Sequence, residues 1–174
     1  GQLRGRVLFG AGGAGGVELS SMVTIATMFY RPAGDAGGGP LAALLGGASL
    51  EGRREAMLEV VVAHEVGHQW WHGVVGSDSR EHPFQDEALA QYAAMLYVED
   101  RYGAARAERE TREQVTRGYH AMRLMGRPDA PVDRPVSAFA DPLSYGGLVY
   151  GKGPHLYVAL RRLLGDRAFF SALR

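Results

Sequence analysis

Two histidines four positions apart, His64 and His68, enclose the carboxylate of Glu65 in the run HEVGH. Residues i and i+4 lie on one face of an α-helix, so both imidazoles can reach a single metal ion. Glu65 follows the first histidine directly and can hold a water molecule beside that ion. Zinc with three protein ligands keeps a fourth position open and lowers the pKa of water bound there to about 7. The spacing predicts a catalytic metal centre with Glu65 as general base; a chance match in a surface helix is the alternative.

A third ligand is available in Glu87, which follows His68 by 19 positions. A helix, a loop and a returning helix can bring this carboxylate beside the two imidazoles. The chain has no cysteine, so a zinc ion must be held by histidines and carboxylates. We therefore expect His64, His68 and Glu87 to bind one Zn²⁺ per chain.

The hydrophobic period predicts the helices that position these residues. Apolar residues recur at helical spacing from about 54 to 71, which includes HEVGH. A second helix should begin near Asp86 and Glu87, whose charges suit a helix N-terminus, and end at Gly103. Further helices are expected over about 105–125 and 154–164.

The first 50 residues have a different character. The apolar run 6–9 and the β-branched stretch 21–30 predict strands, with a glycine-rich turn between them, and residues 31–49 read as a loop. The expected fold class is α+β, mostly helical with a small N-terminal sheet. We expect one catalytic domain over 1–174, a piece of a longer protein, with a strand and loop region in 1–50 and a helical zinc-binding region in 51–174.

Composition narrows the function classes. The 174 residues are 46% hydrophobic, enough for the core of one domain, and the formal net charge is zero. A nucleic-acid-binding protein would show a basic face, so no nucleic-acid partner is expected. No apolar run approaches the ~18 residues that span a bilayer. The absence of cysteine excludes a disulfide scaffold and leaves the cellular location open.

The run HEVGHQWWHGVVGSDSREHPFQDEALAQY resembles the zinc core of the gluzincin aminopeptidases, a family that includes alanyl and membrane aminopeptidases and leukotriene hydrolase. The family pattern is HExxH, eighteen residues and a glutamate, which His64, Glu65, His68 and Glu87 match position by position. The resemblance covers most of residues 10–165. It implies a thermolysin-like fold, flanking domains in the complete protein, and hydrolysis of the N-terminal peptide bond of peptides by zinc-activated water.

The resemblance also implies roles for two tyrosines. Tyr150-Gly151-Lys152-Gly153 resembles the family's Tyr-x-Lys-Gly, whose tyrosine donates a hydrogen bond to the oxyanion of the tetrahedral intermediate. A phenol suits this role because it is a neutral donor at pH 7 on a stiff ring. Tyr145 matches a second tyrosine that lines the substrate site in part of the family.

Upstream, Gly15-Gly16-Val17-Glu18-Leu19 resembles the exopeptidase motif Gly-x-Met-Glu-Asn. In that motif a strand edge binds substrate backbone and the glutamate anchors the free α-amine. Val17 and Leu19 depart from the usual Met and Asn. The resemblance thus implies that Gly15, Gly16 and Glu18 bind peptides with a free N-terminus.

Three other interpretations compete. Residues 10–15 formally match GxGxxG, with Asp35 twenty positions further on, but a dinucleotide site needs a helix directly after the last glycine, and a β-branched stretch follows. An aminopeptidase-like interaction scaffold would be expected to lose metal ligands or the base, and all are present. A zinc endopeptidase, or another hydrolase on the same fold, would use the same zinc and glutamate on a different bond, and only Glu18 argues for substrates with a free N-terminus.

Overall fold

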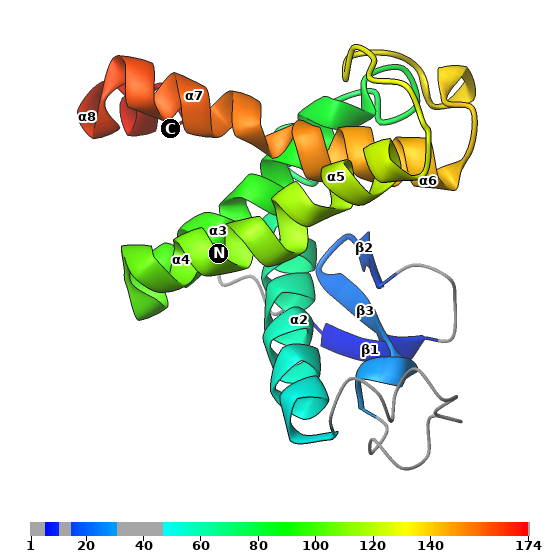
Figure 1. Ribbon diagram of the computed structural model, residues 1–174. Coiled ribbons are helices and arrows are strands. Elements are labelled where there is room, and N and C mark those ends of the chain that lie inside the picture. The colour runs from blue at the N-terminus through cyan, green and yellow to red at the C-terminus, as the bar shows by residue number, and fades with distance from the viewer. Residues whose placement is uncertain (1–5, 11–14, 31–46, 174) are drawn as a thin grey trace. The chain divides into compact units, whose positions relative to one another are not determined.

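The computed structural model describes residues 6–10, 15–30 and 47–173, and the chain divides into two compact units, Gly1–Val74 and Val75–Arg174 (Figure 1). The first unit holds a three-stranded sheet and one long helix. The second is helical throughout its regular structure. A mostly helical α+β chain with a small N-terminal sheet was predicted, and this fold class is confirmed.

In the first unit, the strands β1 (Arg6–Gly10), β2 (Gly16–Leu19) and β3 (Met22–Ala26) form a sheet in the order β1-β3-β2. The central strand β3 pairs parallel with β1 and antiparallel with β2. The strands β2 and β3 form a hairpin in which Leu19 pairs with Met22 across a two-residue turn. Exposure alternates along β2, with Val17 and Leu19 exposed and Glu18 partly covered, so Glu18 points to the opposite face from its neighbours.

Helix α2 (Gly47–Gly67) packs beside this hairpin, as the cyan helix and blue strands of Figure 1 show. Alternate residues of β3 point inward, and Ile25 is fully buried. The core of this unit consists of Ile25, Ala26 and Phe29, with Leu58, Val61 and Val62 of α2 packed against it. Because β-branched side chains fit both a strand face and this helix stripe, the sheet and the helix bury each other's apolar sides.

The first unit corrects several predicted bounds. The helix expected over about 54–71 spans Gly47–Gly67, and the strand expected over 21–30 ends at Ala26, where the 3-10 helix η1 (Thr27–Phe29) follows. The expected loop over 31–49 is wrong at its end, because α2 already begins at Gly47; residues 31–46 lie outside the described residues. Strand β2 rather than a helix begins directly after Gly15, so the structure required for a dinucleotide site is absent there.

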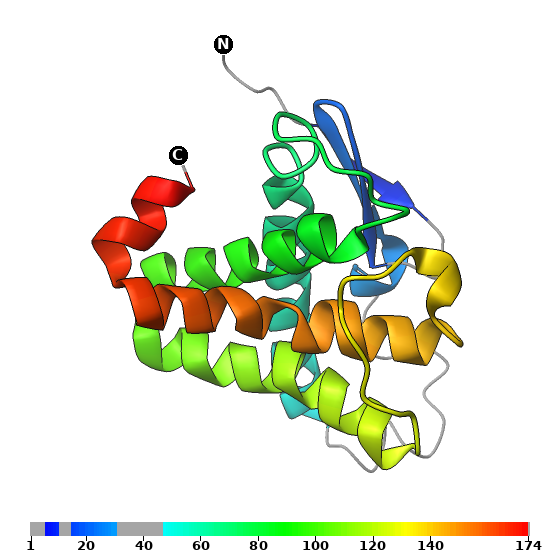
Figure 2. The ribbon, with the colours of Figure 1, turned by 90° about the horizontal axis from the view of Figure 1, so that it is seen from above.

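In the second unit, helices α3, α4–α5 and α6–α7 run alongside one another (Figure 2). Gly103 ends α3 with a φ of 84°, as predicted for a glycine cap, and its N–H donates to the Glu99 carbonyl at 2.8 Å. The predicted helix over 105–125 is present, interrupted only by a π-helical stretch. The elements are η2 (Phe84–Ala88), α3 (Leu89–Tyr102), α4 (Ala104–Glu110), η3 (Thr111–Thr116), α5 (Arg117–Leu124), η4 (Val136–Ala138), α6 (Pro142–Tyr145), η5 (Gly146–Lys152), α7 (Pro154–Leu164) and α8 (Asp166–Ala172).

Glycines let segment η5 lie close to α5. A Cβ at Gly147 would stand 2.6 Å from the Met122 Cβ, and a Cβ at Gly151 would stand 2.7 Å from the backbone nitrogen of Tyr119. The two glycines are four positions apart and therefore occupy one helical face. Their missing side chains thus allow the helical segment that carries Tyr150 to pack against α5.

Arg161 ties the C-terminal helices to α3. Its guanidinium donates to both carboxylate oxygens of Glu99, at 2.6 and 3.0 Å, and its Nε donates to Asp166 at 2.8 Å. The same guanidinium lowers the pKa of the Asp166 carboxyl. Nearby, burial raises the pKa of Tyr157 to about 12.

Among the described residues, no helix has the length and apolar character that crossing a membrane requires.

Candidate metal centre

The HEVGH run lies at the C-terminal end of α2 and is buried. His64, Glu65 and His68 retain 7%, 5% and 1% of their exposure. The His68 N–H donates to the His64 carbonyl at 3.1 Å, so the helical bond pattern continues one residue beyond the end of α2. The predicted geometry of two histidines on one helical face is therefore present.

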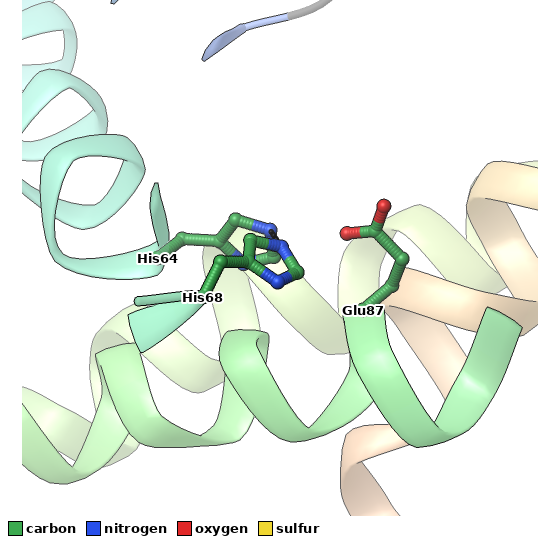
Figure 3. A group of neighbouring side chains, drawn as sticks. All are labelled: His64, His68 and Glu87. Atoms are coloured by element: carbon green, nitrogen blue, oxygen red, sulfur yellow. Dashed lines mark hydrogen bonds between the residues drawn. The ribbon is translucent and has the colours of Figure 1, made fainter. Parts of the chain in front are cut away.

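The two imidazoles converge through their outer nitrogens. His64 Nε2 and His68 Nε2 are 3.0 Å apart, and the rings meet edge to face at 84° (Figure 3). Two nitrogens bound to one tetrahedral zinc at about 2.0–2.1 Å are separated by roughly 3.3 Å. The observed spacing and the buried imidazole donors thus fit a zinc ligand pair.

A backbone contact orients His68 for this role. Its Nδ1 lies 3.3 Å from the Trp71 carbonyl oxygen, which can only accept a hydrogen bond. Nδ1 therefore carries the proton, and Nε2 presents its lone pair. Metal-ligating histidines typically donate their second ring nitrogen to a carbonyl or carboxylate in this way.

The hairpin packs directly against HEVGH. A carboxylate oxygen of Glu18 lies within 4.8 Å of a ring nitrogen of His68. A Cβ at Gly16 would stand 2.5 Å from Glu65 Oε1, so only glycine leaves room for that carboxylate. At Gly15 the nearest atom to a Cβ would be a methyl of Val61, at 3.5 Å. The first unit thus brings together four of the predicted site residues with Glu18, namely Gly16, His64, Glu65 and His68.

Glu87, the third predicted ligand, belongs to the second unit. It lies in η2, which leads into α3, and Figure 3 shows its carboxylate extending away from the helix backbone. Its side chain is partly buried, next to the buried Asp86. Its carboxylate is the third donor of the predicted His/His/carboxylate set, the composition of several catalytic zinc sites.

Tyr150 and Tyr145 lie together in the second unit. Their ring centroids are 5.8 Å apart, and the ring centroids of Phe139 and Tyr145 are 5.1 Å apart. Two residues further on, Lys152 Nζ donates to Asp129 Oδ1 at 2.7 Å and anchors the preceding loop. Tyr150 lies in π-helical η5 as Glu87 lies in π-helical η2, and π-helical turns occur often at functional sites.

One residue at the site was not assigned a role from the sequence. The side chain of Gln69, directly after His68, bonds to the backbone on both sides of the β2–β3 turn. The partners themselves are about 50 residues away in the sequence, where no local pattern points to them.

Residues 42–174 match the Peptidase family M1 domain. The chain belongs to this family. The match includes the candidate ligands, Glu65 and both tyrosines, and it begins after the hairpin that carries Glu18. The resemblance drawn from the sequence is therefore confirmed, and this M1 domain is a peptidase domain of the metallopeptidase class.

A relative of this M1 domain is an aminopeptidase N from Lactobacillus delbrueckii subsp. lactis. It is 24% identical over 127 residues, which make up 68% of this chain and 14% of the relative. The relative is thus much longer than this chain, which agrees with the expected flanking domains. No solved structure matches the chain.

Proposed function

We propose that this M1 domain is the catalytic part of a zinc aminopeptidase that removes N-terminal residues from peptides. The observation that carries the proposal is the packing of the Glu18 hairpin against the buried His64, Glu65 and His68. His64, His68 and Glu87 would hold one zinc ion. When bound, zinc supplies a Lewis acid for the peptide carbonyl and lowers the pKa of water at its open position.

Glu65 is the proposed acid and base. Its carboxylate takes a proton from the attacking water as the oxygen bonds to the peptide carbon, and it returns this proton to the nitrogen as the C–N bond breaks. The products are an amino acid and a shortened peptide. Tyr150 is proposed to donate a hydrogen bond to the carbonyl oxygen as that oxygen gains negative charge.

Glu18 is proposed to select the free N-terminus. Its carboxylate lies within 4.8 Å of a His68 ring nitrogen, so an α-ammonium bound to it would lie close to a proposed zinc ligand. Charge-assisted hydrogen bonds between ammonium and carboxylate are stronger than neutral ones. Gly15 and Gly16 would bind substrate backbone along the free edge of β2, an edge strand of the sheet.

Replacing Glu18 with Ala should raise the KM of aminoacyl substrates about tenfold or more, because the ammonium loses a charge-assisted partner. Steady-state kinetics with aminoacyl and N-acetylated peptides measure this effect. Val17→Ala is the matched control, since Val17 is in the same strand with its side chain exposed, and it should leave KM unchanged. Equal cleavage of N-acetylated peptides by the unsubstituted chain would instead indicate an endopeptidase.

Replacing Gly16 with Ala should lower kcat about 100-fold, because the new Cβ takes the place of the Glu65 carboxylate and displaces the base. The clash is with the end of a flexible side chain, so the thermal unfolding midpoint should change little. Gly52→Ala is the control, because Gly52 lies in α2 and a Cβ there would meet nothing within 4 Å. A normal kcat for Gly16→Ala would show that the position of Glu65 does not limit turnover.

A further inference from the structure

We infer that Gln69 is a positioning residue that fixes the distance between the carboxylate of Glu18 and the HEVGH helix, and thereby sets which peptide bond is cut. The inference rests on the proposed function, since it assigns Glu18 to the substrate's α-ammonium. Gln69 is neither a proposed zinc ligand nor a residue proposed to touch the substrate; it acts through the hairpin.

Both polar atoms of the Gln69 side-chain amide form hydrogen bonds. Its Oε1 accepts from the Ser21 N–H at 2.8 Å, and its Nε2 donates to the Leu19 carbonyl at 2.9 Å. The two partners enclose the turn between β2 and β3. A primary amide carries an acceptor and a donor on one carbon, and asparagine is one methylene shorter than glutamine. Glutamine at this position therefore matches the turn in both chemistry and length.

The turn needs such support. Ser21 has a φ of 61°, in the left-handed region that residues with a side chain seldom adopt. A two-residue hairpin turn usually has glycine, asparagine or aspartate at such a position. The far end of the hairpin is fastened separately, by the Ala26 N–H to the Gly15 carbonyl at 2.9 Å. Gln69 thus stabilises the turn end of the hairpin, where the residues Ser20 and Ser21 are not the types that favour such a turn.

The consequence for the reaction follows from the positions of the neighbours. Glu18 precedes Leu19, which Gln69 binds, and His68 precedes Gln69 itself. The Gln69 amide therefore links Leu19, which follows Glu18, to the position directly after the proposed ligand His68. If the turn moves, the space between Glu18 and His68 changes while the helix stays in place. A fixed space admits one residue between the α-ammonium and the scissile carbonyl.

The test uses two variants and a control. Gln69→Leu is similar in size and removes both hydrogen bonds; Gln69→Glu keeps the acceptor for Ser21 and loses the donor to Leu19. Ser20→Ala alters the same turn and leaves both bonds intact. KM for an aminoacyl substrate should rise about tenfold in Gln69→Leu, less in Gln69→Glu, with kcat changed less than twofold. Ser20→Ala should behave as the unsubstituted chain.

Two further readouts separate positioning from a merely structural role. In a Glu18→Ala background, Gln69→Leu should have no additional effect on KM, because the group it positions is gone. Amide hydrogen exchange, which needs no activity, should be about fivefold faster at the Ser21 N–H in Gln69→Leu. Faster exchange with unchanged KM, or an equal KM effect without Glu18, overturns the positioning role. Unchanged exchange overturns the Gln69 hydrogen bonds as a restraint on the turn, whereas equal cleavage of N-acetylated peptides by the unsubstituted chain contradicts the proposed function instead.

Discussion

Replacing Glu65 with Gln should remove nearly all peptide hydrolysis, about 10²–10⁴-fold in kcat, while the zinc content of the chain stays unchanged. The amide has the size of the carboxylate but cannot take a proton from water at neutral pH. Glu65 is not a proposed ligand, so the metal has no reason to leave. Kinetics with an aminoacyl substrate and elemental analysis by mass spectrometry on the same preparation measure both quantities.

Glu55→Gln is the matched control for this experiment. Glu55 lies on the same helix and is exposed, so its substitution makes the same chemical change away from the site. Its kcat should equal that of the unsubstituted chain. Activity near the unsubstituted level in Glu65→Gln would contradict the acid–base role, and a simultaneous loss of zinc would make Glu65 a ligand instead.

Replacing Glu87 with Ala should remove most of the bound zinc, because three protein ligands are needed to hold a catalytic ion and two histidines on one helix bind it far more weakly. The unsubstituted chain should carry about one zinc per chain. Glu81→Ala is the control, since Glu81 is an exposed glutamate shortly before the proposed ligand. Elemental analysis decides the result even if the domain needs its flanking parts to turn over substrate.

The zinc measurement also separates the competing interpretations. A folded chain that stays free of metal after zinc is supplied would favour the aminopeptidase-like scaffold. Full zinc content in Glu87→Ala would show that another group completes the ligand set. Loss of zinc in Glu87→Ala, with retention in Glu81→Ala, would support the three-ligand proposal.

Local sequence patterns predicted the helices well where the apolar period is regular. The helix with HEVGH and the cap at Gly103 follow from residue spacing and from glycine's freedom at positive φ. The helical path of 142–152 was not assigned, because three glycines weaken the helical signal there. Packing decides it instead: Gly147 and Gly151 lie where α5 leaves no room for a Cβ.

The candidate site likewise combines features that the local sequence predicts with features that depend on tertiary contacts. The convergence of the His64 and His68 nitrogens follows from i, i+4 spacing and was predictable from the sequence. The orientation of His68 by the Trp71 carbonyl and the close fit of Gly16 over Glu65 depend on tertiary contacts that no local pattern contains. The zinc ion and the roles of Glu87, Tyr150, Tyr145 and Glu18 remain predictions.

The two hydrogen bonds of Gln69 also bear on the order in which the chain folds. The β2–β3 hairpin and α2 can each form from contacts between close neighbours, whereas these two bonds join residues 48 and 50 positions apart. Closing so long a loop costs chain entropy before any contact repays it, so long-range contacts of this kind form late. The hairpin and helix would therefore be present before their mutual distance is fixed, and the geometry proposed to choose the scissile bond would be completed only at the end of folding.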